Sequence, residues 1–175
     1  MMASDLARVA PIRLVIFDVD GVLTDGRIVL DDEGRELKFF DVRDGQGLRL
    51  LKGAGLEAAF LTGRRSRVVE LRARDLGVSL VWQGVPDKLE VYEALLVERS
   101  LTDEQVAFAG DDLVDLPVMR RVGLALAPAD AAEEIKAAAH FVSNRAGGRG
   151  AVRDMVEYIL KGQGRWEEVT APYHR

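Results

Sequence analysis

Short apolar runs alternate with amphipathic stretches along most of the chain. The runs have the length and composition of buried parallel strands and lie at residues 13–17, 56–61, 78–82, 106–109, 124–127 and 140–142. The stretches between them predict helices at residues 45–52, 66–76, 88–98, 116–121, 131–138 and 151–160. This alternation predicts an α/β fold, a Rossmann-like parallel sheet with helices on both faces.

Two segments depart from the alternation. Residues 27–30 and 35–40 are β-prone and flank the turn-forming residues 31–34, so we expect a β-hairpin over about 27–40, after the first strand. The tail, residues 163–175, is interrupted by glycine and proline, and we expect it to be extended. Neither a repeat nor a low-complexity linker divides the chain, so we expect one domain over residues 1–175.

Composition and charge exclude several classes of protein. Of 175 residues, 48% are hydrophobic and 30% charged, which is a globular balance. The net charge of −5 argues against a nucleic-acid binder, because such proteins carry basic surfaces. With no cysteine and two histidines, disulfide scaffolds, cysteine nucleophiles and thiolate or histidine-rich metal sites are excluded. Without a membrane-spanning run or a signal-peptide core, we expect a cytoplasmic protein with no membrane partner.

Polar residues follow several predicted strands at the points where these end. Asp18 and Asp20 follow the first strand, Thr62 the second and Asp111 a later one, while Lys88 opens a helix. Ligands of open parallel sheets bind beyond the carboxyl ends of the strands, so these side chains are expected to converge. Oxygen ligands without histidine or cysteine favour Mg²⁺, and Lys88 and the Thr62 hydroxyl suit phosphate oxygens.

This set of residues suits transfer of a phosphoryl group. Asp18 could attack phosphorus and form an aspartyl-phosphate. Asp20 lies on the same side of an extended chain and could act as general acid, then as general base for water. Each motif by itself also fits capping acids and turns, and capping acids with surface charges are the alternative interpretation. The ordered placement after strands favours a site.

The segments DVDGVLTD, LTGR, DK and GDDLVD resemble, in this order, the four motifs of haloacid dehalogenase-type phosphatases. Over nearly the whole chain, and through VRDGQGLR, QGVPDK and GGRGAVRD, the sequence is similar to 3-deoxy-D-manno-octulosonate 8-phosphate phosphatases. The resemblance implies a Mg²⁺-dependent phosphatase acting on this sugar-acid phosphate in lipopolysaccharide synthesis. It also implies a homotetramer.

The resemblance further implies roles for individual residues. Asp18 would be the nucleophile and Asp20 the acid/base, while Thr62 and Lys88 would bind the phosphoryl group. The metal would be held by Asp18, the carbonyl of Asp20 and Asp111, with Asp112 or Asp115 orienting Lys88 and the metal's waters. The substrate would be contacted by Asp20, Asp41, Val42, Arg43, Asp44, Gly45, Arg49, Arg64, Arg72 and Lys88. Arginines suit a substrate with both phosphate and carboxylate, although Arg49 and Arg72 also fit a solvated helix face.

The spacing of the motifs leaves no room for a cap domain. Only the hairpin and a helix lie between Thr24 and Thr62, and only a helix, a strand and a turn between Thr62 and Lys88. Exclusion of water would then fall to a neighbouring subunit. The hairpin is unusually apolar and is predicted to pair with other hairpins, the alternative being that it packs on its own sheet; its apolar residues are Ile28, Val29, Leu30, Leu37, Phe39 and Phe40.

Other functions stay open at this point. One is a phosphatase for a nine-carbon sialic-acid-type phosphate. Another is a receiver-like module that keeps its aspartyl-phosphate, which Asp20 argues against because it supplies acid–base chemistry for turnover. A third is a regulatory domain without activity, although no motif is missing. The loop at residues 144–150, with three glycines and two arginines, fits either a mobile anion-binding loop or a flexible turn.

Overall fold

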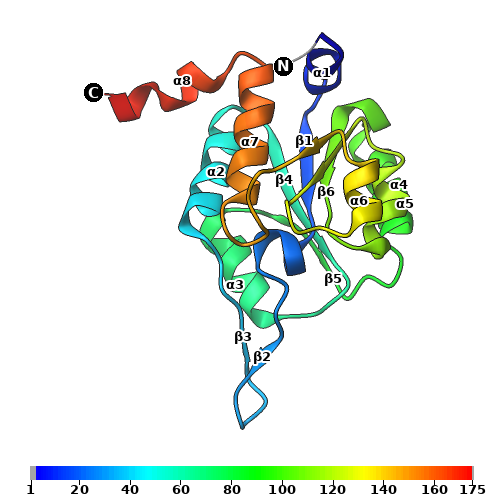
Figure 1. Cartoon of the computed structure of the whole chain (residues 1–175), viewed down its shortest axis with the longest axis vertical. Helices are drawn as coiled ribbons and strands as arrows, with labels where there is room; N and C mark the ends of the chain where they lie inside the picture. The colour runs from blue at the N-terminus through cyan, green and yellow to red at the C-terminus, as the bar shows by residue number, and fades with distance from the viewer. Residues whose placement is uncertain (1–2, 175) are drawn as a thin grey trace.

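The computed structural model describes residues 3–174 and has a six-stranded parallel sheet at its centre (Figure 1). The strands lie in the order β5-β4-β1-β6-β7-β8, and every neighbouring pair is parallel. Their bounds are β1 (Leu14–Phe17), β4 (Glu57–Thr62), β5 (Leu80–Gln83), β6 (Val106–Ala109), β7 (Leu124–Ala127) and β8 (Phe141–Val142). The predicted α/β fold is confirmed.

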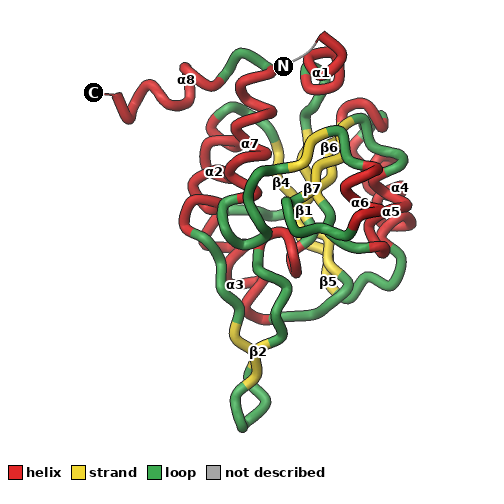
Figure 2. The backbone as a smooth tube through the Cα atoms, in the orientation of Figure 1, coloured by secondary structure: helices red, strands yellow, loops and turns green. Residues whose placement is uncertain are grey.

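Helices cover both faces of this sheet (Figure 2). One layer holds α2 (Val42–Gly53), α3 (Arg67–Leu76) and α7 (Ala151–Gly162), and the other α4 (Lys88–Arg99), α5 (Leu116–Met119) and α6 (Glu133–Ala138). Successive residues of a strand point to opposite faces, so Val15 and Phe17 pack on the first layer and Leu14 and Ile16 on the second. Burial on both sides explains the unbroken apolar runs of the sequence.

The expected hairpin forms a separate two-stranded ribbon, β2 (Val29–Leu30) with β3 (Glu36–Leu37). It projects from the end of the molecule at which β1 ends (Figure 1). The paired residues are fewer than the predicted span of 27–40, and Ile28, Leu30 and Phe39 are each more than half exposed. Phe40 alone of the hairpin's aromatic residues packs against the core. The hairpin therefore does not pack flat on its own sheet.

The prediction of an extended tail is wrong. Residues Trp166–Thr170 form α8 and Ala171–His174 a 3₁₀ turn, whereas Arg175 lies outside the described residues. Gly164, with a φ of 68°, separates this segment from α7. The Trp166 ring then packs under Arg153 and Lys161, whose charged groups lie 5.3 and 5.0 Å from its centroid. Contacts with α7 thus stabilise a helical tail that the local sequence does not predict.

A helix that the pattern did not predict, α1 (Ala3–Val9), precedes β1, with Val9 buried in the core. Gln163 holds the segment between α1 and β1, because its Nε2 donates to the carbonyls of Val9 (3.0 Å) and Ile12 (2.9 Å).

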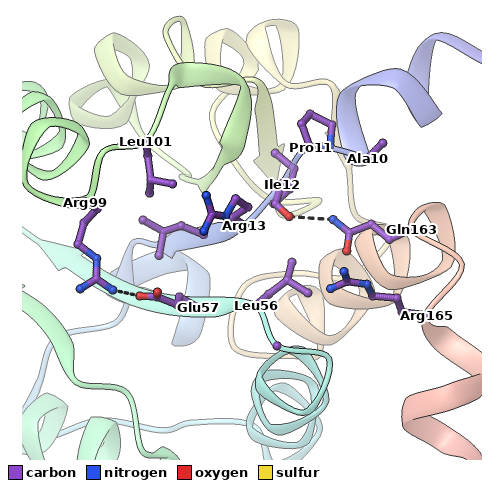
Figure 3. Close-up of a pocket in the computed structure, with 12 residues that line it drawn as sticks. Ala10, Pro11, Ile12, Arg13, Leu56, Glu57, Arg99, Leu101, Gln163 and Arg165 are labelled. Atoms are coloured by element: carbon purple, nitrogen blue, oxygen red, sulfur yellow. Dashed lines mark hydrogen bonds and ion pairs between the residues drawn. The ribbon is translucent and has the colours of Figure 1, made fainter.

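A cavity of about 400 Å³ opens beside Gln163 at the amino ends of β1 and β4, with Arg13 and Arg165 on its walls (Figure 3). This cavity lies at the end of the strands opposite to the predicted site. No helix in the described part of the chain could cross a bilayer.

Candidate active site

The chain turns sharply directly after β1. Asp18 is buried and its Oδ1 accepts a hydrogen bond from the N–H of Val19 (2.7 Å), which caps the turn η1 (Val19–Leu23). Helical geometry in this turn is interrupted at Asp20 and at Gly21, whose φ is 92°. A side chain at Gly21 would overlap the carboxylate of Asp111. Glycine is therefore needed both for the backbone conformation and for the approach of Asp111.

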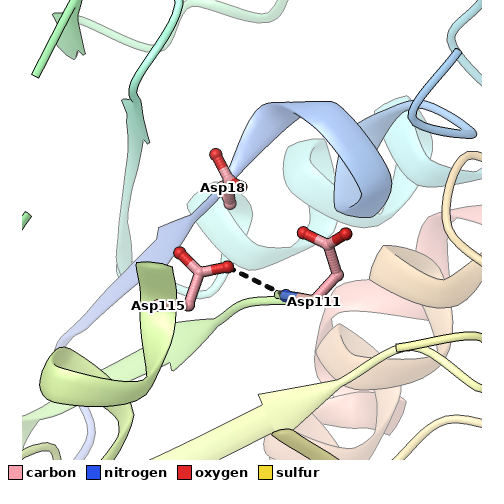
Figure 4. Close-up of side chains that lie close together, drawn as sticks. All are labelled: Asp18, Asp111 and Asp115. Atoms are coloured by element: carbon pink, nitrogen blue, oxygen red, sulfur yellow. Dashed lines mark hydrogen bonds between the residues drawn. The ribbon is translucent and has the colours of Figure 1, made fainter. Parts of the chain in front are cut away.

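Three carboxylates meet at this edge of the sheet (Figure 4). Asp18 follows β1, Asp111 follows β6, and Asp115 ends the 3₁₀ turn η3 (Leu113–Asp115), with one oxygen of each within 4.8 Å of the others. Oδ2 of Asp115 accepts from the N–H groups of Asp111 (3.0 Å) and Asp112 (3.3 Å). Asp115 is thus fixed by the backbone of its own loop. The carboxylate of Asp111 accepts no hydrogen bond from residues 3–174.

Lys88, the first residue of α4, reaches into this group of acids. Its buried Nζ lies 2.6 Å from Oδ1 of Asp115 and 3.0 Å from Oδ2 of Asp18. Burial alone would lower the pKa of Lys88, but the charges of the two carboxylates outweigh it and the pKa is raised. The ammonium is therefore a fixed positive charge beside Asp18.

One lysine does not balance three acids. Burial, together with the charge of Asp115, raises the pKa of Asp18 to about 7 although Lys88 opposes the shift. Burial, then the charges of Asp18 and Asp115, raise the pKa of Asp111 to about 8. Excess negative charge among oxygen ligands suits a hard divalent cation. Asp18 and Asp111, with the nearby backbone of η1, therefore fit Mg²⁺.

Thr62 completes the group predicted from the sequence. It is buried at the carboxyl end of β4, the strand next to β1, and its Oγ1 accepts from the N–H of Arg64 (3.4 Å). The structure thus brings together, at one sheet edge, the end of β1, the end of β4, the start of α4 and the loop after β6. These are the elements that carry Asp18, Thr62, Lys88 and Asp111.

Asp20 belongs to a second cluster of charges, at the base of the hairpin. Its Oδ1 contacts Nζ of Lys38, and its Oδ2 lies 3.7 Å from Nε of Arg64. Glu36 lies beside both cations, with its Oε1 3.0 Å from Arg64 and 3.4 Å from Lys38. Sequence reasoning missed Glu36 and Lys38. Their signal was the alternation of Glu36 and Lys38 with the apolar Leu37 and Phe39 in the second arm of the hairpin.

The acidic residues at the start of α2 form contacts within the protein. Asp41 caps α2, accepting from the N–H of Arg43 (2.7 Å) and from its guanidinium. The buried carboxylate of Asp44 accepts from the N–H groups of Gly150 (3.2 Å) and Arg153 (2.8 Å) at the start of α7. Burial raises the pKa of Asp44 to about 6. These contacts join the α2 and α7 termini.

Among residues 3–174, no hydrogen bond or ion pair joins Val42, Arg49 or Arg72 to Asp18, Asp111 or Asp115, and Arg72 pairs instead with Asp75 (2.8 Å). The guanidinium of Arg72 lies 5.6 Å from the centroid of the Phe40 ring, and a side chain at Gly45 would overlap it. Val42 and Arg49 are exposed on α2. Val42 is 84% exposed.

The glycine-rich loop, residues 144–150, packs directly on η1. The N–H of Gly148 donates to the carbonyl of Val22 (3.0 Å), and that of Gly147 to Oδ1 of Asp130 (2.9 Å). A guanidinium nitrogen of Arg149 lies 3.5 Å from Oδ2 of Asp25. The loop therefore supports the turn that carries Asp20.

The chain is similar to known phosphatases in sequence and in fold. Residues 78–153 match the family model of haloacid dehalogenase-like hydrolases. The chain is 47% identical over 165 residues to the 3-deoxy-D-manno-octulosonate 8-phosphate phosphatase of Yersinia pestis, covering 94% of this chain and 88% of the relative. It is 45% identical to the Escherichia coli K12 phosphatase of the same name, over 95% of this chain and 88% of the relative. The Moraxella catarrhalis phosphatase, solved in complex with magnesium, phosphate and KDO, superposes with a TM-score of 0.96 at 37% identity, covering 99% of both chains.

Proposed function

Because the chain belongs to the haloacid dehalogenase-like hydrolases, among the 3-deoxy-D-manno-octulosonate 8-phosphate phosphatases, we infer that it is a Mg²⁺-dependent phosphatase of this sugar-acid phosphate. The observation that carries the mechanism is the meeting of Asp18, Asp111 and Asp115 around Lys88. A buried site with this charge binds a cation and a phosphoryl group together.

In the proposed reaction, Asp18 attacks phosphorus while the bond from phosphorus to the sugar oxygen breaks. Asp20 gives its proton to that oxygen, and the free sugar acid leaves. Water then attacks the aspartyl-phosphate, Asp20 takes its proton, and phosphate is released with Asp18 restored. Lys88 and Thr62 hold the phosphoryl oxygens. When bound, Mg²⁺ neutralises phosphoryl charge.

The same geometry supports the proposed ligand and support roles. Asp18, the carbonyl of Asp20 and Asp111 would hold Mg²⁺. Asp115 orients Lys88 through the 2.6 Å contact, and Asp112 caps the turn that carries Asp115. Asp115 is the stronger candidate for this supporting role. Within residues 3–174, Lys88 forms its ion pairs with Asp18 and Asp115, whereas the Asp112 side chain accepts from the N–H of Leu113 (2.7 Å).

Recognition of the sugar acid is proposed for the surface around the hairpin and α2. Arg64 lies beside Asp20, so its guanidinium is placed to bind a substrate group near the leaving oxygen. Arg72 and Arg49 would bind the carboxylate of the substrate. Residues 41–45 at the start of α2 would line the substrate site. Support for this assignment comes from the position of Arg64 and from the substrate named for the relatives.

A homotetramer is proposed as the working form. Its support is the projecting hairpin, where Ile28, Leu30, Leu37 and Phe39 are between 53% and 64% exposed. Apolar surface of this kind is costly in water and favours burial between subunits. Light scattering at micromolar protein concentration is expected to give a tetramer, and a monomer would contradict the proposal.

The substrate is tested by phosphate release with Mg²⁺ from sugar-acid phosphates of eight and nine carbons, with hexose phosphates as controls. We expect a strong preference for the eight-carbon acid. Preference for the nine-carbon acid would favour the sialic-acid-type alternative, and equal slow hydrolysis would remove the substrate assignment. No release with a stable phosphoprotein would indicate a phosphoacceptor module. Cytoplasmic location and a role in lipopolysaccharide synthesis are proposed with this substrate, and cell fractionation tests the location.

A further inference from the structure

Lys38 is a buried lysine for which the mechanism above has no use. It stands directly after β3, at the base of the hairpin, and its side chain is 2% exposed. An ammonium withdrawn from water needs anionic partners. Lys38 has two, because its Nζ contacts Oδ1 of Asp20 and lies 3.4 Å from Oε1 of Glu36.

Arg64 closes these residues into a ring of alternating charge. Its Nη2 lies 3.0 Å from Oε1 of Glu36 and its Nε 3.7 Å from Oδ2 of Asp20. Ser66 donates a hydrogen bond to the other oxygen of Glu36. Glu36 is thereby held by the loop after β4, and Lys38 is confined between Glu36 and Asp20.

The two cations of the ring differ in how firmly they hold Asp20. Arg64 is 44% exposed, and its 3.7 Å approach is longer than a hydrogen bond. Exposed ion pairs of this kind contribute little. Lys38 is enclosed and in direct contact, and such a charge-assisted bond fixes geometry well. Lys38 therefore determines where the Asp20 carboxylate lies.

We propose that Lys38 is a positioning residue for the reaction, acting through Asp20. It holds the Asp20 carboxyl group where this group can give a proton to the leaving oxygen and later take a proton from the attacking water. The inference rests on the proposed function, in which Asp20 is the acid/base. Proton transfer requires hydrogen-bond reach, and small displacements of the transferring group cost rate.

Lys38→Met tests this role in two substrates that differ in leaving group. The alkoxide of the eight-carbon sugar-acid phosphate needs a proton, whereas p-nitrophenolate leaves readily without one. We expect kcat/KM to fall about 10- to 100-fold for the sugar-acid phosphate and about threefold or less for p-nitrophenyl phosphate. The matched control is Lys136→Met on α6, which removes a lysine paired only with the exposed Glu133 and should change neither value. Equal losses in both substrates, or no loss, would overturn the proposal.

A double-mutant cycle separates positioning from direct substrate binding. In the Asp20→Asn background, Lys38→Met is expected to change kcat/KM by about twofold or less, because its effect passes through Asp20. If the two substitutions lower kcat/KM by factors that multiply in the double variant, Lys38 acts independently of Asp20 and the proposal is overturned. Full activity of Asp20→Asn would refute the acid–base role itself, whereas a slow Asp20→Asn with a fully active Lys38→Met would refute only the role of Lys38.

Folding of each variant is checked by circular dichroism and light scattering. If Lys38→Met does not fold, Glu36→Gln is compared in the same assay, because it keeps Lys38 and removes the charge of its second anion. The expected order is the same, with the larger loss for the sugar-acid phosphate. Equal losses in the two substrates would again overturn the proposal.

Discussion

Gly147 lies against the backbone carbonyl of Gly21, so closely that a side chain at position 147 would overlap that oxygen. The loop after β8 and the turn after β1 are therefore in van der Waals contact at the backbone of both. Because η1 carries Asp20 and adjoins Asp18, the contact joins a distant loop to the proposed catalytic groups.

Gly147→Ala is expected to displace η1, because the added Cβ would overlap the carbonyl oxygen of Gly21 and the two backbone segments would have to move apart. Overpacking of this kind costs about 1–3 kcal/mol of stability, and we expect kcat to fall about 10-fold. Thermal unfolding and steady-state kinetics measure the two effects. The control is Gly53→Ala at the end of α2, where a Cβ meets nothing within 4 Å. Equal behaviour of the two variants would show that the contact does not matter.

Asp115→Asn removes one of the two anions that hold Lys88. Loss of a partner from a buried ion pair costs about 3 kcal/mol of stability, and a displaced Lys88 should lower kcat about 10-fold or more. Chemical denaturation and kinetics give both values. The comparison is Glu93→Gln, which breaks the partly exposed 2.7 Å pair with Arg121 and is expected to cost less than about 1 kcal/mol. Equal costs would contradict the account of Lys88.

Mg²⁺ is expected to stabilise the folded protein, because it binds the native carboxylates and not the unfolded chain. At about 100 times its Kd the gain is roughly 2.7 kcal/mol, or about 5–10 °C in Tm, and EDTA should reverse it. Scanning calorimetry should show the shift lost in Asp111→Asn and kept in Glu98→Gln on the exposed side of α4. A shift that survives Asp111→Asn would place the metal elsewhere.

Asp44 predicts a pH dependence of stability. Its pKa in the folded protein is about 6, against an ordinary value of 3.8, because burial disfavours the charged form. Between these values the folded state binds more protons than the unfolded state, so the free energy of unfolding falls as pH rises, by roughly 2 kcal/mol. Asp44→Asn should lack this component. Urea denaturation from pH 4 to pH 7 tests it, and parallel curves for the two proteins would refute the assignment.

Sequence reasoning could predict the sheet and the convergence of polar side chains at its edge, because both depend on local pattern. The buried strands are continuous apolar runs. Asp18 and Thr62 directly follow such runs, and Asp111 follows one after Gly110. Parallel strands end at the same edge, so convergence follows from the fold class. Lys88 was found for a related reason, since Asp87 marks the start of its helix.

What the sequence did not reveal depends on contacts between distant segments. The turn η1 needs the left-handed Gly21 and the packing of Gly147, which are far apart in sequence. The burial of Lys38 arises only when the hairpin base meets Arg64 in the loop after β4. The helical tail likewise depends on the packing of Trp166 on α7. No local periodicity encodes these contacts.

Asp18 is proposed to carry the phosphoryl group during the reaction. The test mixes Asp20→Asn, in which hydrolysis of the intermediate is slowed, with Mg²⁺ and p-nitrophenyl phosphate, whose leaving group needs no proton. The reaction is quenched in acid and the modification is located by peptide mass spectrometry. We expect one phosphoryl group on Asp18, and a folded Asp18→Asn variant with neither phosphoryl group nor turnover. A phosphoryl group on another residue, or turnover by Asp18→Asn, would contradict it.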